Sequence, residues 1–356
     1  DKTGATASQI KERAVYDLIR AYCGVSQYDK IVTFLVDHEE AFLSTVTKAK
    51  TARLVRQILD IVESLIDDLN IQERVARSML EWTIAHKRSF LRQRVQAKLA
   101  SILYHQEKYA EALDLIEKLL VELKKLDDKQ LLVESHLLES QLYFAVSNLP
   151  KAKAALTASR TAANEIYVTP LLQASMDKQS GTLHTKEGDY NTAHSYFLEA
   201  FEQLDTLGDS SALQALKYMM LCKILDSLRL LLKGSPVSMD GMITSKQAVQ
   251  YAGRGLEAMQ EVAKATANRN LKELQAALVA YKEELSGDFM IAHNLDILQE
   301  QLLESNLLRI IQPYSKVEIA HVASCMELDV DFTERKLSQM ILDGKLSGIL
   351  DQGHAQ

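Results

Sequence analysis

The sequence predicts an all-α fold, in which a right-handed α-solenoid of stacked helix pairs continues into a helical region and then a small α+β winged helix. Three observations support this prediction. The 356 residues include only 13 Gly and 4 Pro, so long helices are rarely interrupted. A short motif recurs through the middle of the chain. The last segment shows two helical patterns, a glycine and a short apolar run, an order typical of a winged helix.

The length of the chain favours two or three domains. We expect the solenoid over residues 1–210, with residues 1–9 disordered. The following helical region should span residues 211–311, and the winged helix residues 312–356, with its wing cut short. Pro313 marks the start of this last module, because proline rarely continues a helix.

The solenoid is predicted from a motif in which an apolar or aromatic residue precedes a small residue by three positions. The pairs are Tyr109/Ala112, Leu149/Ala152 and Tyr190/Ala193. The alanines are spaced by 40 and then 41 residues, and a period of this size can hold two helices. One helix pair cannot bury its apolar face alone, so pairs stack, and the small residue allows close approach. The motif is of tetratricopeptide type (TPR-like), with a longer period.

The winged helix is predicted from two helical stretches, KVEIAHVASCM and DFTERKLSQMILD, joined by a short link. Gly344 should end the second helix, and a strand should follow. The residues of this wing strand are Leu346, Ser347, Gly348, Ile349 and Leu350. An exposed strand edge can accept a strand from a neighbouring chain, so we expect this edge to bind another subunit.

A second candidate surface is a run of basic residues in a chain whose net charge is −7. Its members are Lys87, Arg88, Arg92, Arg94 and Lys98. Leu91, Val95, Leu99 and Ile102 should form the buried stripe of the same helix. The basic side chains either pair with nearby acids on a solvated helix face or dock an acidic protein surface. Nucleic-acid binding is a third reading, although phosphate binding usually needs a larger basic field.

The charge of the winged helix argues against DNA reading. Residues 316–345 hold four basic and six acidic residues, a balance of −2. A DNA-reading winged helix needs a basic recognition helix that reaches phosphates and base edges.

No catalytic, cofactor-binding or metal-binding motif is present in the sequence. Phosphate loops, dinucleotide-binding turns, HExxH, CxxC and GxSxG patterns are all missing. The nearest approach to a ligand cluster is His38 with Glu39 and Glu40, which we interpret as a solvated helix face. We therefore expect no enzyme activity, no cofactor and no bound metal. Three unpatterned cysteines favour a reducing compartment, and no apolar run is long enough to cross a membrane.

Four segments resemble the PCI family, and within it the PCI subunits of the proteasome lid. The segments are ELKKLDDKQLLVE (122–134), LLESQLYFAVSNLPKAKAALTASRTAANEIY (137–167), LKYMMLCKIL (216–225) and ERKLSQMILDGKLSGILDQG (334–353). A helical solenoid that leads into a C-terminal winged helix is the architecture of this family.

The resemblance implies a non-catalytic scaffold of the cytoplasm and nucleus that functions in ubiquitin-dependent protein degradation. Its implied partners are other PCI lid subunits, the ATPase ring and the α-ring of the core particle, which the solenoid would brace against the lid. Two alternatives remain: a PCI scaffold of the signalosome or of a translation-initiation complex, and a winged-helix nucleic-acid binder.

Overall fold

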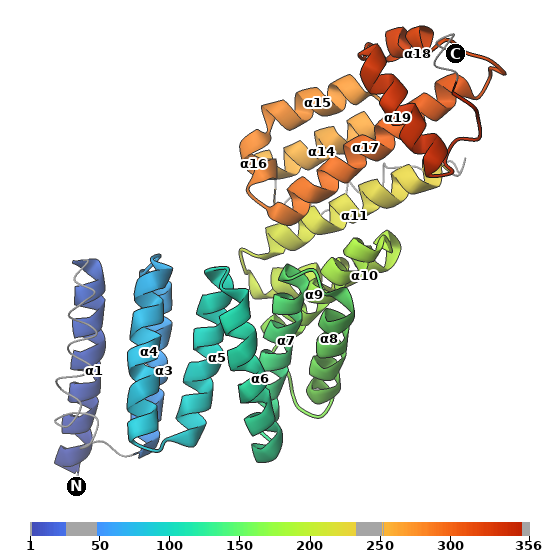
Figure 1. The fold of residues 1–356 in the computed structure, drawn as a ribbon. Coiled ribbons are helices and arrows are strands. Elements are labelled where there is room, and N and C mark those ends of the chain that lie inside the picture. The colour runs from blue at the N-terminus through green and yellow to red at the C-terminus, as the bar shows by residue number, and fades with distance from the viewer. Residues whose placement is uncertain (1, 26–47, 233–250, 252, 351–356) are drawn as a thin grey trace. The chain divides into compact units, whose positions relative to one another are not determined.

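In the computed structural model, residues 2–25, 48–232, 251 and 253–350 are described, and every element of regular structure among them is an α-helix. The all-α part of the prediction is therefore confirmed. The chain divides into two compact units, residues 1–179 and 180–356 (Figure 1). The boundary falls inside helix α9 (Pro170–Glu187), earlier than the boundary expected at residue 210.

The first unit is a succession of helices in which each described helix packs against the next. Those that lie wholly within it are α1 (Lys2–Gly24), α3 (Lys48–Leu65), α4 (Leu69–Ala85), α5 (Ser89–His105), α6 (Tyr109–Leu126), α7 (Lys129–Ala145) and α8 (Leu149–Ala163). Helix α5 also packs against α7, as expected when helix pairs stack. One continuous apolar core extends from Val15 in α1 to Leu142 in α7.

Helix α1 differs from the expectation that residues 1–9 are disordered, because it spans Lys2–Gly24. Helix formation is costly only at its nucleus, and each further residue adds a hydrogen bond. The apolar positions Val15 and Ile19 bury the second half of α1 in the core. The helix thus extends from this buried second half toward the N-terminus, through residues whose sequence has no apolar periodicity.

The repeat motif has the structure that its spacing predicts. Tyr109, Leu149 and Tyr190 are the first residues of α6, α8 and α10 (Tyr190–Leu207). The three alanines that follow them, Ala112, Ala152 and Ala193, are completely buried. The register of the repeat is therefore confirmed, with the small residue in the first turn of the second helix of each pair.

A left-handed residue precedes each of these helices. Glu107, Ser147 and Gly188 have φ values of 63°, 62° and 79°. The N–H of the residue after each one donates back to the preceding helix, as in Asn148 to the Tyr143 carbonyl at 2.8 Å. This pattern closes a helix with a left-handed residue, a position where glycine is usual. Only one of the three repeats uses glycine there.

The second unit is also helical. Besides the C-terminal part of α9 it contains α10, α11 (Ala212–Leu232), α14 (Arg254–Ala267), α15 (Leu271–Ala280), α16 (Lys282–Ser286), α17 (Phe289–Ile311), α18 (Ile319–Met326) and α19 (Val330–Leu342). Helices α9 and α10 approach so closely that a Cβ atom on Gly181 would lie 2.8 Å from the ring of Phe197. Asp288, at the start of α17, accepts hydrogen bonds from Tyr218 (2.6 Å) and Gln214 (2.7 Å) of α11, which fixes these two helices together.

The C-terminal module has the two predicted helices, α18 and α19, with a three-residue link, Glu327–Asp329. Val322, Leu337 and Met340 pack with Leu303 and Leu307 of α17 in one small core. Gly344 adopts a left-handed conformation after α19, as predicted for a helix end.

The wing strand is not seen. Residues 347–350 have no regular structure, and no strand occurs in the described part of the chain. A strand forms only when another strand satisfies its backbone groups. Here Leu346 and Leu350 pack instead on the core formed by α17, α18 and α19. The expected strand at 346–350 is therefore wrong for this structure, and the β part of the winged helix is missing from the described residues.

The buried alanine of the motif gives a matched pair of substitutions. Ala112→Leu should lower the free energy of unfolding by about 1–3 kcal/mol, because added atoms have no space in a filled core. Ala110, two positions earlier in α6, is exposed, and Ala110→Leu should change stability by less than about 0.5 kcal/mol. Urea denaturation of both variants would measure the difference, and equal stabilities would contradict the proposed packing.

The left-handed turns give reciprocal substitutions. Ser147→Gly should stabilise the protein by up to about 1 kcal/mol, because glycine adopts the left-handed conformation without strain. The greater freedom of glycine in the unfolded chain offsets part of this gain. Gly188→Ala should destabilise it by about 1 kcal/mol for the opposite reason. Thermal melting should move in opposite directions for the two variants. A shift of the same sign in both would show that backbone strain does not decide stability at these turns.

Candidate protein-interaction surfaces

The sequence suggested that the five basic residues lie on a single helix. The structure shows that they do not. Helix α5 begins at Ser89, so Lys87 and Arg88 belong to the turn that precedes it. Lys87 is left-handed with a φ of 51°, and the Arg88 N–H donates to the Thr83 carbonyl of α4 at 2.9 Å. This hydrogen bond closes α4 before α5 can start. The predicted apolar stripe of α5 is confirmed, since its four residues, Leu91, Val95, Leu99 and Ile102, are buried.

Three of the basic side chains form ion pairs with neighbouring helices. Arg92 pairs with Glu122 of α6, Arg94 lies 4.0 Å from Asp128 at the start of α7, and Lys98 pairs with Glu63 of α3. These contacts match the reading of a solvated helix face that pairs with nearby acids. Each such pair contributes little to stability on a partly exposed surface. Their effect is to hold the side chains across the helix stack.

The turn before α5 is the part of the basic run that reaches solvent. Lys87 is exposed and makes no ion pair with a described residue, whereas Arg88 lies over the Trp82 ring at 5.9 Å. Ile84 and Phe90 flank this turn with exposed fractions of 54% and 63%. Two exposed apolar side chains beside Arg88 and Lys87 make this turn a candidate for a protein contact, since aromatic residues and arginine are enriched at interfaces. The sequence reasoning missed Phe90, although a phenylalanine within the basic run was a signal that could have been used.

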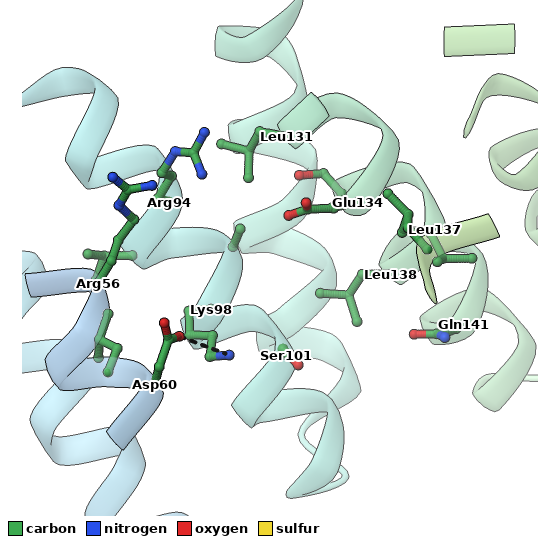
Figure 2. Close-up of a pocket in the computed structure, with 15 residues that line it drawn as sticks. Arg56, Asp60, Arg94, Lys98, Ser101, Leu131, Glu134, Leu137, Leu138 and Gln141 are labelled. Carbon is green, nitrogen blue, oxygen red and sulfur yellow. Dashed lines mark ion pairs between the residues drawn. The ribbon is translucent and has the colours of Figure 1, made fainter. Parts of the chain in front are cut away.

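Arg94 and Lys98 also line a cavity of about 360 Å³ in the first unit (Figure 2). Its walls come from α3, α5 and α7, and Leu172 of α9 completes the lining. The sequence reasoning missed the contributions of α3 and α7. Arg56 and Glu134 stand 38 residues before and 40 residues after Arg94, so the repeat period could have identified them.

An ion network around the buried Lys336 and Glu304 joins the C-terminal module to α17. Lys336 of α19 is only 8% exposed at its side chain, and it pairs with Glu300 and with Glu304 at 3.2 Å. Lys345 also binds Glu304, at 2.8 Å. Burial alone would lower the pKa of Lys336, but the hydrogen bonds from its ammonium to the two glutamates raise the pKa overall. The same hydrogen bond to Lys336 lowers the pKa of Glu300.

This network bears directly on DNA binding. Helix α19 takes the position of a recognition helix, and its basic residues are Arg335 and Lys336. Since Lys336 is buried against α17, it cannot reach a phosphate. Together with the negative balance of the module, the structure gives no support to a DNA-reading role.

The predicted wing residues line a second cavity. Leu346, Ser347, Gly348, Ile349 and Leu350 border a space of about 320 Å³ with parts of α18 and α19. Ile349 is 96% exposed. The segment is thus brought to the surface as expected, but as irregular backbone.

No catalytic or metal-binding arrangement is found in the described part of the chain. Among these residues, no three His, Cys, Asp or Glu side chains are grouped as ligands for a metal ion. His38, Glu39 and Glu40 lie outside the described residues. Cys23 and Cys222 are buried and Cys325 is exposed, all three as free thiols. A search of the described helices for a membrane span, by length and hydropathy, gives no candidate.

Two family models match the chain. The model of the 26S proteasome regulatory subunit RPN6 N-terminal domain matches residues 1–107, and the PCI domain model matches residues 272–355. The 26S proteasome non-ATPase regulatory subunit 11 homolog of Arabidopsis thaliana is 48% identical over 98% of this chain and 81% of that protein. The chain belongs to the RPN6 family of 26S proteasome regulatory subunits.

Two further RPN6 relatives align over similar shares of the two chains, at lower identity. The probable 26S proteasome regulatory subunit rpn6 of Schizosaccharomyces pombe is 42% identical over 96% of this chain and 80% of that protein. The 26S proteasome regulatory subunit RPN6 of Saccharomyces cerevisiae is 39% identical over 97% of this chain and 79% of that protein. A crystal structure of a Rap protein complexed with competence and sporulation factor aligns with a TM-score of 0.40 at 14% identity. It covers 95% of this chain and 98% of that one, and we infer nothing from it.

The ion network of this RPN6-family chain can be tested by substitution. Lys336→Met should lower the free energy of unfolding by about 1–3 kcal/mol, because the buried Glu304 loses one of its two cationic partners and keeps only Lys345. Arg335→Met is the matched control, since Arg335 is exposed, and it should cost less than about 0.5 kcal/mol. Denaturant titration of both variants at neutral pH measures the two effects. Similar costs would show that burial of the Lys336 cation is not the cause.

The same network predicts a pH dependence. A lowered pKa for Glu300 means that its contribution is present above the unfolded-state pKa, near about 4.3, and is lost as pH falls through the folded-state value. A raised pKa for Lys336 means that its contribution is present below about 10.4 and is lost as pH rises beyond that. The stability difference between wild type and Lys336→Met should therefore be flat near neutrality and should shrink at acidic pH. An equal difference at pH 3 and pH 7 would contradict this.

Proposed function

We propose that this chain is a non-catalytic scaffold subunit of the proteasome lid, which helps to assemble the regulatory particle and to brace it on the core particle for ubiquitin-dependent degradation. One observation supports this above all others: regulatory subunits of the 26S proteasome are 39–48% identical to nearly the whole chain. The described residues also offer large helical surfaces and no group of reactive side chains. A scaffold needs only the former.

The proposed partners follow from the two parts of the chain. The PCI module would contact other PCI subunits of the lid, and the solenoid would contact the ATPase ring and the α-ring of the core particle. We propose cytoplasm and nucleus as its location, where proteasomes function. The domain division proposed from the sequence, with the solenoid over 1–210 and the winged helix over 312–356, remains a proposal. So does the right-handed turn of the solenoid.

The segment 346–350 is a proposed contact with a neighbouring subunit. Its backbone has no strand partner among the described residues, and a strand from another chain would satisfy it by edge pairing. The irregular conformation of the segment is compatible with this role only if pairing orders it into a strand.

The alternatives receive less support. A PCI scaffold of the signalosome or of a translation-initiation complex would share the fold, but the relatives named above are proteasome subunits. A nucleic-acid binder would need an accessible basic face on α19, which the burial of Lys336 does not provide.

Affinity purification of the tagged full-length protein from its own cells tests the proposal, with the co-purifying chains identified by mass spectrometry. Recovery of lid subunits, ATPases and core subunits is the expected result. Recovery of a different PCI complex, or of nucleic acid without proteasome subunits, would overturn the proposed function but leave the fold intact.

The turn before α5 is the proposed docking surface for an acidic partner, and Lys87→Glu tests it. Reversal of this exposed charge should reduce recovery of the core particle by roughly tenfold while the melting temperature stays unchanged. Lys118→Glu, an exposed lysine of α6, is the control and should leave recovery unchanged. We avoid Arg92 here, because loss of its ion pair with Glu122 could alter folding as well. Unchanged recovery with Lys87→Glu would argue against this surface.

A further inference from the structure

The cavity of the first unit is lined by residues that hold equivalent positions in successive repeats. Arg56, Arg94 and Glu134 are spaced by 38 and 40 residues, and they line the cavity from α3, α5 and α7 in turn. Asp60, Lys98 and Leu138 have the same spacing and form a second row. Stacked helices lie about 8–10 Å apart, which is close to the length of three residues in an extended chain. An extended peptide that runs across the helices would therefore pass from one helix to the next about every three of its own residues. At each helix it would meet one side chain of each row.

The two sides of the cavity differ in chemistry. Arg56 and Arg94 lie on one side, and Leu137 and Leu138 on the opposite side (Figure 2). Arg94 makes one long ion pair, 4.0 Å between its charged atoms and those of Asp128, so its guanidinium keeps donors for another carboxylate. The Glu134 carboxylate of the lining also interacts electrostatically with Arg94. Lys98 lies 4.0 Å from Asp60 and also pairs with Glu63, which offsets its charge. Arg94 is thus the cation of the lining that can bind a further carboxylate.

Buried polar atoms in the lining point to a ligand that brings hydrogen-bonding groups. Ser135 is 1% exposed and lines the cavity, yet its hydroxyl has no hydrogen-bond partner. Leaving a buried hydroxyl unpaired is costly. Ser101, Gln141 and Glu134 also present polar groups to the cavity (Figure 2). A peptide backbone has both donors and acceptors and would satisfy such a set.

The repeat spacing favours an extended peptide over a helix. An extended chain advances about 3.3 Å per residue, so about three residues reach from one helix of the stack to the next. An α-helix rises only about 1.5 Å per residue and would need about six residues for the same step. An extended chain therefore matches the rows with fewer residues.

We propose that this cavity binds a short extended segment of another protein that carries an acidic side chain beside an apolar one. The carboxylate accepts hydrogen bonds from Arg94. The apolar side chain packs on Leu137 and Leu138, and the backbone bonds to Ser135 and its polar neighbours. The site is separate from the turn before α5 and from the C-terminal module, so it does not depend on the proposed docking surfaces.

Fluorescence anisotropy on the full chain tests this proposal with a fluorescein-labelled hexapeptide, Gly-Asp-Asp-Ile-Leu-Gly-amide. We expect saturable binding with a Kd below about 1 mM. Peptides with Asn-Asn in place of Asp-Asp, or Ser-Ser in place of Ile-Leu, should bind at least roughly tenfold more weakly.

Two arginine variants provide the matched comparison. Arg94→Ala should weaken binding by at least roughly tenfold, whereas Arg53→Ala should change it by less than about twofold. Arg53 is exposed on α3, one turn before Arg56, and does not line the cavity. Circular dichroism should show that both variants melt at the wild-type temperature.

Three results would overturn the proposal. One is the absence of saturable binding by the acidic peptide to a folded protein. Another is equally tight binding of the Asn-Asn peptide, or equally tight binding of the acidic peptide by the Arg94→Ala variant, since the contact would then not depend on the arginine side of the cavity. The third is Arg94-dependent binding of a labelled oligothymidine in place of the peptide, which would assign the cavity to nucleic acid. None of these results bears on incorporation into the proteasome, which the affinity purification tests by itself.

Discussion

The close approach of helices through residues without a large side chain is the constraint on which the rest of this structure depends. Ala112, Ala152 and Ala193 are fully buried, and Gly181 leaves no space for a Cβ atom beside Phe197. These contacts fix the distance between helices. In the first unit, one continuous apolar core holds α3, α5 and α7 together, which places Arg56, Arg94 and Glu134 along one cavity, although 38 and 40 residues of sequence separate each from the next. The surface chemistry of the first unit is therefore set by packing in its core.

The sequence predicted the features that follow from local periodicity. The repeat register, the buried stripe of α5 and the two helices of the C-terminal module were all confirmed. Each depends on apolar or small residues at fixed spacings, and burial forces those residues into one register. The resemblance to PCI subunits of the proteasome lid was also correct, because it used long runs of specific residues.

The errors arose where a tertiary partner decides the outcome. Residues 346–350 have the composition of a strand, but strand formation needs a second strand, which no local pattern can supply. The basic run looked continuous because charge was counted along the sequence. Its division between a turn and α5 depends on the Arg88 hydrogen bond that closes α4. The cavity was missed because its lining comes mainly from three helices that are far apart in sequence. In the sequence, these residues are related only by the repeat period.

The turns between the two helices of each pair have a consequence for how sequences of this family can diverge. Their geometry is held by main-chain hydrogen bonds, such as that from Asn148 to Tyr143, and the left-handed residue itself points away from the core. Glutamate, serine and glycine occupy this position in the three repeats of one chain. The rim of the helix stack can therefore change its charge from one lineage to another while the core stays constant. Single substitutions at these turns can therefore create contacts with new partner proteins while the fold stays the same.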